Sequence, residues 1–146
     1  MRKYLFLTIA TAVSIFLIVP ASYADLSDQM QEGKELVKSS QQLMDKGEML
    51  MAYKDQDKVW LVDQGHQMLK EGMDMIEKGE MMYTDQGRSY VQEIGAEMRT
   101  AGNLLLKMGR KKDPLTPKDK EEIVKKGKAM TDLGKLKLDQ GKLMAP

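Results

Sequence analysis

The stretch that decides the fold runs from Gly65 to Gly79 and reads GHQMLKEGMDMIEKG. Glycine recurs in it at every seventh residue, and an apolar pair follows three and four places later, as Met68 and Leu69 follow Gly65. Because seven residues make about two turns of an α-helix, the glycines form one stripe along the helix, with apolar residues beside it. The stretch therefore predicts a helix that packs against other helices.

The same seven-residue spacing of small residues extends over most of the chain. The sequences around Gly47 and Gly79 nearly match at an offset of 32 residues, which indicates an internal duplication of a helical unit. No strand-like alternation of apolar and polar residues occurs. The small residues with this spacing are Gly33, Ser40 and Gly47, then Gly65, Gly72 and Gly79, then Gly95, Gly102 and Gly109, and finally Gly127, Gly134 and Gly141.

Four helical segments are expected, separated by three short connections. The first connection, residues 54–58, contains neither glycine nor proline, so one continuous helix across it is the alternative. Helices of this length with short connections predict an all-α fold, an antiparallel up-down-up-down four-helix bundle with glycine at heptad interface positions. The expected helices cover residues 26–53, 58–83, 85–109 and 117–143.

Several residues are predicted to cap these helices. Ser27 or Asp28 is expected at the start of the first helix, Thr84 at the start of the third and Thr116 at the start of the fourth, because hydroxyl and carboxylate oxygens accept from free backbone N–H groups. Gly109 is expected to end the third helix as its C-cap.

The interior glycines need a physical explanation, because each costs about 0.8–1 kcal/mol relative to alanine. We expect the missing side chains to let two helices approach closely, with short interhelical distances at Gly65, Gly72 and Gly79. The alternative is that glycine keeps the helices pliable, so that they open or become ordered on a partner.

The start of the chain has the pattern of a secretory signal peptide. Two cations precede an apolar run that ends at Pro20, and the small residues Ser22 and Ala24 suit a cleavage site after Ala24. We therefore expect residues 1–24 to be removed and residues 25–146 to form one helical domain in the periplasm or outside the cell. An uncleaved anchor is the alternative, which the short run disfavours.

Composition excludes some classes of partner. Loss of residues 1–24 removes two cations and no acid, which changes the formal charge from +1 to −1. A chain near neutrality without a Lys/Arg cluster is not expected to bind nucleic acid. The chain contains no Cys, so helix packing rather than disulfides must stabilise an exported domain.

Of the 14 methionines, 13 follow residue 24, which raises the hypothesis of a copper(I) or silver(I) site, since thioethers are soft ligands. Two ligands on one helix share an ion when they are three or four residues apart, and no two methionines have this spacing. Met68, Met75 and Met82 instead follow the seven-residue period. We expect them to pack in the core, so that a metal site would have to be built between helices.

Four apolar residues lie off the stripe that flanks the glycines, namely Met49, Trp60, Met73 and Met81. One interpretation is a wider apolar face, as bundle helices need. The other is an exposed methionine and aromatic surface for an unfolded client, a partner helix or a membrane surface. These four residues are therefore the candidate partner surface.

No residue is predicted to be catalytic or to bind a cofactor. His66 is the only histidine and has no partner at helical spacing, so we expect a partly exposed polar residue. The tripeptide Asp-Gln-Gly, at Asp63, Asp85 and Asp139, is expected to be solvated. Because the chain also lacks Cys, the usual pairs of nucleophile and base have no residues from which to form, and we expect no enzyme activity.

The leading hypothesis is an exported, non-enzymatic helical bundle that binds or scaffolds another macromolecule, an unknown protein partner or client, through apolar helix faces. The alternative is a periplasmic soft-metal protein that binds copper(I) or silver(I) through inter-helical methionines. A third is a protein that lies on the membrane surface, which the near-zero charge disfavours. The thin apolar face of the last helix leaves a homodimer as an alternative to a bundle closed within one copy.

Overall fold

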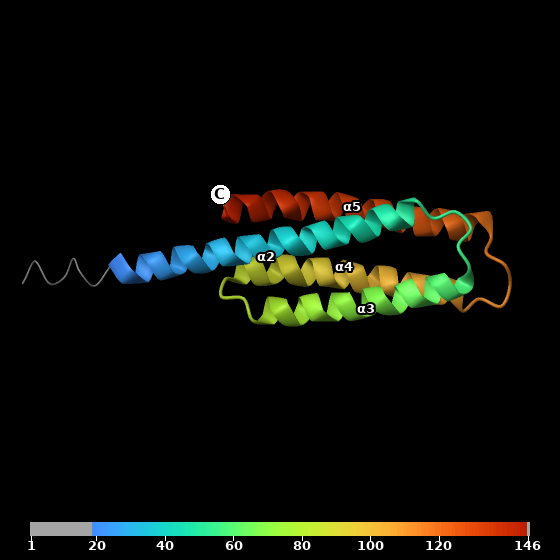
Figure 1. Cartoon of the computed structure of the whole chain (residues 1–146), viewed down its shortest axis with the longest axis horizontal. Coiled ribbons are helices and arrows are strands. Elements are labelled where there is room, and N and C mark those ends of the chain that lie inside the picture. The colour runs from blue at the N-terminus through green and yellow to red at the C-terminus, as the bar shows by residue number, and fades with distance from the viewer. Residues whose placement is uncertain (1–18, 146) are drawn as a thin grey trace, which may run out of the picture.

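The structure is a computed structural model that describes residues 19–145. These residues contain four α-helices and no β-strand, and the helices pack side by side (Figure 1), which confirms the predicted all-α class and the helical bundle. The predicted signal peptide falls largely on residues 1–18, outside the described residues. The helices are α2 (Val19–Met51), α3 (Lys58–Glu80), α4 (Asp85–Gly109) and α5 (Pro117–Met144).

The first described helix begins earlier than the sequence pattern predicts. α2 is already helical at Val19, the first described residue, and passes without a break through the predicted cleavage position after Ala24. The expectation that Ser27 or Asp28 caps this helix is therefore wrong for the uncleaved chain, while cleavage itself stays a prediction.

The polar run at residues 54–58 does break the helix. The Asp57 carboxylate accepts the backbone N–H of Trp60 at 2.8 Å and so caps the start of α3. An aspartate cap explains how the chain turns here without glycine or proline. The alternative of one continuous helix across the first connection is thus wrong.

Hydroxyl caps begin the last two helices, as predicted. The Thr84 hydroxyl accepts the N–H of Gly87 at 3.0 Å at the start of α4. At the start of α5, Thr116 and Asp119 form a capping box in which each side chain accepts the other residue's backbone N–H. Both predicted threonine caps are confirmed, and each fixes where a helix starts.

Gly109 is not the C-cap that the sequence predicts for α4. Arg110 occupies the cap position with φ of −91°, and no described residue has a positive φ. A Cβ added at Gly109 would lie 2.7 Å from Cγ2 of Val62 and 3.0 Å from the carbonyl oxygen of Lys58. Close packing against α3, rather than a special backbone conformation, therefore accounts for this glycine.

α3 and α4 form one closely packed pair, which we call the α3/α4 pair. A Cβ added to Gly72 would lie 2.6 Å from the carbonyl oxygen of Gly95, and one added to Gly102 would lie 2.7 Å from that of Gly65. Cβ atoms in proteins essentially never approach a backbone atom this closely. A side chain at these positions would force the two helices apart, so the short approach predicted for Gly65 and Gly72 is present.

α2 and α5 form a second pair of the same kind, the α2/α5 pair, although they lie at opposite ends of the chain. A Cβ at Gly127 would lie 2.5 Å from the carbonyl oxygen of Gly47, and a Cβ at Gly33 would lie 2.9 Å from that of Gly141. Most close backbone contacts between helices therefore fall within the two pairs, and far fewer join one pair to the other.

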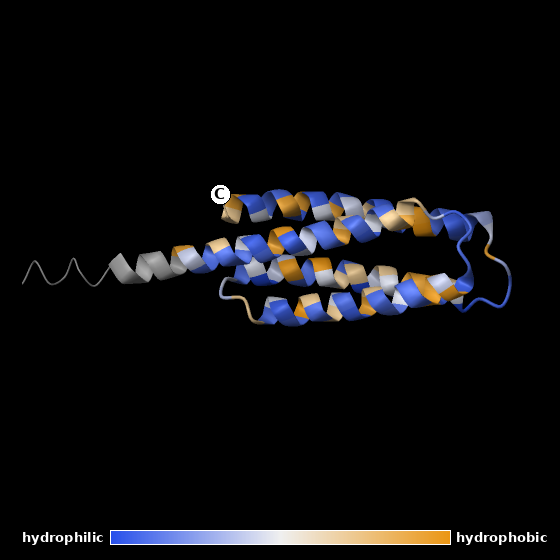
Figure 2. Ribbon diagram, in the orientation of Figure 1, coloured by the Kyte–Doolittle hydropathy of each residue, from blue (hydrophilic) through white to orange (hydrophobic). Residues whose placement is uncertain are grey.

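Larger side chains fill the space between the pairs and make the hydrophobic core. Met68, Met75 and Met82 are buried there, which confirms core packing for this methionine stripe. Hydrophilic residues cover most of the outer faces (Figure 2). Within residues 19–145, no helix combines the length and apolar character needed to cross a bilayer. Other buried core residues are Leu36, Leu43, Leu50, Leu61, Val91, Ile94, Met98, Leu105, Met108, Ile123 and Met130.

The two connections between the pairs, residues 52–57 and 110–116, lie at one end of the bundle (Figure 1), which we call the connection end. Lys58, the first residue of α3, binds the second connection by donating from its ammonium group to the carbonyl oxygen of Asp113 at 2.8 Å. The opposite end contains the turn between α3 and α4, and no described segment joins the pairs there. We call it the Glu32 end, after the residue described next.

Candidate functional site

The four predicted partner-surface residues do not form one patch. Met73 and Met81, in and just after α3, are 52% and 74% exposed, whereas Met49 and Trp60 are partly buried and pack against the core. Trp60 stacks on Tyr53 at the connection end, with ring centroids 5.9 Å apart. At a rise of about 1.5 Å per residue, Trp60 and Met81 are about 30 Å apart along α3. The exposed candidates are therefore Met73 and Met81.

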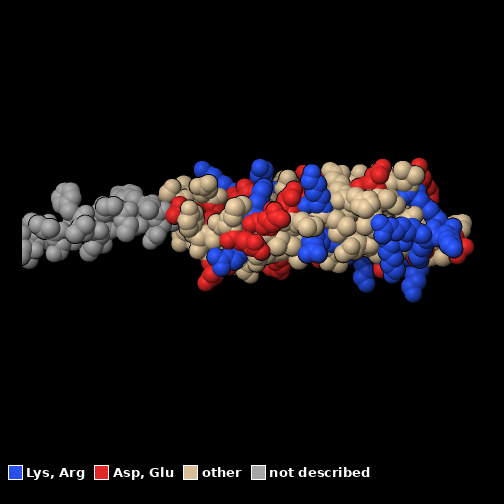
Figure 3. Space-filling view, turned by 90° about the horizontal axis from the view of Figure 1, so that it is seen from below, with Lys and Arg blue, Asp and Glu red and all other residues tan. Residues whose placement is uncertain are grey.

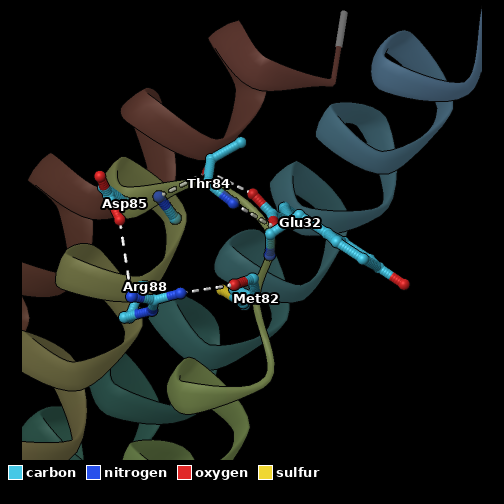
Figure 4. A network of polar contacts seen from close by, with 7 residues as sticks. Glu32, Met82, Thr84, Asp85 and Arg88 are labelled. Atoms are coloured by element: carbon cyan, nitrogen blue, oxygen red, sulfur yellow. Dashed lines mark hydrogen bonds and ion pairs between the residues drawn. The ribbon is translucent and has the colours of Figure 1, made fainter. Parts of the chain in front are cut away.

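Glu32, on α2, binds the turn that joins α3 to α4 (Figure 4). The residue is 5% exposed, yet both oxygens of its carboxylate have partners. One accepts the backbone N–H groups of Tyr83 and, at 3.0 Å, of Thr84, and the other accepts the Thr84 hydroxyl. Because the free N–H groups at a helix N-terminus favour negative charge, the carboxylate stabilises the start of α4 as well as the turn.

Arg88 completes this network from the other side of the turn (Figure 4). Its guanidinium donates to the carbonyl oxygen of Met82 at 3.2 Å and lies 3.5 Å from the carboxylate of Asp85. The end of α3, the turn and the first turn of α4 are thereby tied together. The turn is a fixed feature against which α2 packs.

A pocket of about 230 Å³ opens beside this network, between α2 and the turn. One wall is apolar, and the other is charged. The Lys78 ammonium and the Glu35 carboxylate in this wall form an ion pair at 3.0 Å. The apolar wall consists of Met81, Met82 and Tyr83, and the charged groups are Asp28, Glu32, Glu35 and Lys78.

Three carboxylates and one ammonium give the pocket an acidic lining. Glu80 and Asp85, both exposed, add negative charge beside the turn. On the face seen in Figure 3, the largest group of Lys and Arg side chains lies toward the connection end, and a run of Asp and Glu lies nearer the Glu32 end. The Glu32 end therefore combines exposed apolar surface with acidic charge.

Ion pairs tie the connections to the helices at the connection end. Asp119 accepts from the Lys111 ammonium and, in the capping box, from the N–H of Thr116, and these bonds, in that order, lower the pKa of Asp119 to about 2. The hydrogen bond from Lys120 likewise lowers the pKa of Asp55 in the first connection. These groups hold the two connections to the helices.

Two observations bear on the hypothesis of a metal site. Among the described residues, no three or more His, Cys, Asp or Glu side chains are grouped so as to hold a metal ion. In the pocket, however, Met81 and Met82 bring thioether groups beside carboxylates. His66 is exposed on the outer face of α3, as the sequence predicts.

Sequence reasoning missed Glu32 and Tyr83. The partners of Glu32 are 51 and 52 residues away, so no local motif marks it. Its position next to Gly33, in the glycine stripe, is the one available hint that it faces another helix. The site can bind a ligand through an acidic and apolar surface supported by a fixed turn. Comparison of the chain with models of protein families, with curated proteins and with solved structures finds no match.

Proposed function

We propose that this chain is an exported, non-enzymatic helical bundle that binds or scaffolds another macromolecule through apolar side chains on its helices. The pocket at the Glu32 end carries this proposal, because its apolar wall lies in contact with water. Met81 and Tyr83 are 74% and 78% exposed. Large exposed apolar side chains gathered at a pocket are typical of interaction sites.

The proposal includes an antiparallel up-down-up-down topology with glycine at heptad interface positions. The register of the contacts supports it, since Gly65 meets Gly102 while Gly72 meets Gly95, so that residue numbers rise along α3 as they fall along α4. Helices held this closely present their outer side chains in fixed positions, which favours a binding or scaffolding role.

Capture from an envelope extract tests the function. The purified protein with a C-terminal tag is expected to retain a protein partner reproducibly, and a variant with Met73→Ser, Met81→Ser and Tyr83→Ser is expected to lose it. Leu136→Ser is the matched control, because Leu136 is also exposed, at 55%, but lies on α5. Capture of no macromolecule, or equal capture by all three proteins, contradicts the proposal.

Export rests on the N-terminal sequence pattern. Mass spectrometry of the protein recovered from the periplasm or the medium is expected to find Asp25 as the first residue, after cleavage following Ala24. Recovery of the protein only from the cell interior, with residues 1–24 attached, contradicts this part of the proposal. The same spectra, recorded under native conditions, report whether the protein is a monomer or a homodimer.

The alternative function is copper(I) or silver(I) binding, favoured by the thioethers of Met81 and Met82 in one pocket with carboxylates. Native mass spectrometry with either ion is then expected to detect a bound ion that Met81→Leu with Met82→Leu abolishes. Met73→Leu is the control, because Met73 lies outside the pocket. Absence of a bound ion in the unmodified protein ends the metal alternative.

A further inference from the structure

We propose that the Glu32 end is the macromolecule-binding site and that it takes a basic amphipathic helix, which enters between the α2/α5 pair and the α3/α4 pair. This inference rests on the proposed function and names its site and the chemistry of its partner. The pocket lining, the charges around it and the way the two pairs are joined each support it.

The pocket lining matches both faces of such a helix. Met81, Met82 and Tyr83 offer thioether and aromatic surface, and methionine adapts to varied apolar side chains because it is unbranched and polarizable. The excess of carboxylates in the lining, extended by Glu80 and Asp85, attracts Lys or Arg at the borders of an apolar stripe. An acidic helix would be repelled, because its carboxylates would lie beside the carboxylates of the pocket.

Because of where the chain connects the two pairs, the pairs can separate from each other at the Glu32 end. Both covalent connections are at the connection end (Figure 1), whereas at the Glu32 end polar contacts hold the pairs together. Glu32 binds the turn across the pair boundary, Lys78 pairs with Glu35 at 3.0 Å, and Lys137 pairs with Glu93. Separation can therefore start at the Glu32 end without stretching the chain.

The interior near this end also favours separation. Three buried polar atoms, Oγ of Ser39, Nε of Arg88 and Oε1 of Gln140, have no hydrogen-bond partner among the described residues. Buried polar atoms without partners are unfavourable, so they weaken the packing near this end and lower the cost of opening it. This weakening offsets part of the cost of exposing core side chains such as Leu36 and Met75.

Two synthetic peptides test the partner's chemistry with the purified protein. One is an amphipathic helix of leucine and lysine about 18 residues long, and the other has glutamate in place of lysine. Fluorescence anisotropy of the labelled peptides gives each Kd. We expect the lysine peptide to bind at least about tenfold more tightly. Equal affinities, or tighter binding of the glutamate peptide, overturn the inference.

Matched surface variants test the location. Met81→Ser with Tyr83→Ser removes the exposed apolar wall. The control, Val59→Ser with Leu136→Ser, removes two residues of α3 and α5 that are 67% and 55% exposed and lie outside the pocket. We expect the first pair to weaken lysine-peptide binding about tenfold or more and the second pair by less than about twofold. Circular dichroism confirms that both variants are folded. If both variants weaken lysine-peptide binding equally, the Glu32 end is not the binding site.

A cross-link tests entry between the pairs, since the chain has no other Cys. Glu35→Cys with Lys78→Cys, joined by a short bis-maleimide, holds the Glu32 end closed, and Asp55→Cys with Lys120→Cys is the control at the connection end. For each variant, the affinity for the lysine peptide is measured before and after cross-linking. We expect cross-linking to lower this affinity about tenfold in the Glu35→Cys, Lys78→Cys variant and to leave it unchanged in the Asp55→Cys, Lys120→Cys variant. Undiminished binding in the first overturns entry between the pairs.

Failure of this inference can be told apart from failure of the proposed function. If the Met81→Ser, Tyr83→Ser variant captures an envelope partner as well as the unmodified protein does, while the variant that also carries Met73→Ser loses the partner, the inference is overturned and the proposed function stands. If no macromolecule is captured at all, the proposed function itself is contradicted.

Discussion

Gly72 and Gly79 belong to one stripe of α3, but an added methyl group would meet different neighbours at the two positions. At Gly72 it would lie 2.6 Å from the carbonyl oxygen of Gly95, which belongs to the α4 backbone. At Gly79 it would lie 2.7 Å from Cγ of Gln92 and 3.2 Å from the nearest backbone atom of α4. A flexible side chain rotates away, whereas a backbone carbonyl moves only with its helix.

Gly72→Ala is therefore expected to lower the free energy of unfolding by about 1–3 kcal/mol, because the cost of overpacking exceeds the gain of about 1 kcal/mol in helix propensity. Gly79→Ala is the matched control and is expected to stay within about 1 kcal/mol of the unmodified protein. Urea denaturation followed by circular dichroism measures both. Stabilisation by Gly72→Ala would contradict close packing of α3 on α4.

Asp119 gives the capping box of α5 a defined pH dependence. Its pKa of about 2 lies below the ordinary value of 3.8, first because of the hydrogen bond from Lys111 and then because of that from Thr116. A carboxyl group whose pKa is lower in the folded than in the unfolded protein stabilises the fold above the unfolded pKa and loses this effect as the pH falls through the folded one.

We therefore expect the contribution of Asp119 to be complete above about pH 4 and to disappear as the pH falls to about 2. An NMR titration of the carboxyl carbon measures the pKa directly. Asp119→Asn is expected to lower Tm at neutral pH and to reduce its dependence on pH within this interval. The same slope of Tm against pH in the variant and the unmodified protein would refute the assignment.

Residue-level predictions from the sequence succeed where the cause is local. Thr84 and Thr116 are confirmed as caps. They could be predicted because a cap and the N–H group from which it accepts are only three residues apart. Gly109 is misassigned because glycine serves both a C-cap and a close helix contact, and the partner that decides between them lies on α3. Glu32 is missed for the same reason, since its partners lie across the bundle.

At the level of the elements, four helices follow from the sequence, but their pairing does not. Each helix carries the same stripe of small residues, so any two of them satisfy the condition for close approach. The structure pairs α2 with α5 and α3 with α4. The two pairs then meet through large side chains, and the turn after α3 is where a polar contact fixes how α2 lies on the α3/α4 pair.

Glu32→Gln tests this contact. The amide keeps one acceptor oxygen but replaces the other with a donor, so it cannot accept from Tyr83, Thr84 and the Thr84 hydroxyl together. We expect a loss of about 1.5–3 kcal/mol in the free energy of unfolding, measured by urea denaturation, since hydrogen bonds to charged groups contribute at this level.

Glu35→Gln is the matched control on the same helix. Its partner, Lys78, is partly exposed, so the ion pair is expected to contribute less than about 1 kcal/mol. Amide exchange at Tyr83 and Thr84 is expected to accelerate in the Glu32 variant and not in the control. Equal effects of the two substitutions would show that Glu32 does not fix the turn.

Across the whole molecule, buried polar side chains are more numerous toward the Glu32 end than toward the connection end. Near the connection end most buried side chains are large and apolar, as at Leu50, Leu61 and Met108, although Asp119 and Thr131 are also buried there. Toward the Glu32 end, Glu32, Ser39 and Lys137 are buried beside the apolar residues. Since burial of polar groups contributes less than burial of apolar ones, the two halves of one bundle are expected to differ in local stability.

Native-state hydrogen exchange is expected to reveal this difference. Amides of α2 near Leu36 should exchange through a partial opening at least about tenfold faster than amides near Leu61, which need global unfolding. Ser39→Ala replaces a buried hydroxyl that has no partner among the described residues and is expected to slow exchange near Leu36 selectively. Ser89→Ala, at an exposed position of α4, is the control and should leave the ratio unchanged. Equal exchange rates near Leu36 and near Leu61, or equal effects of the two substitutions, would mean that the pairs separate only when the whole bundle unfolds.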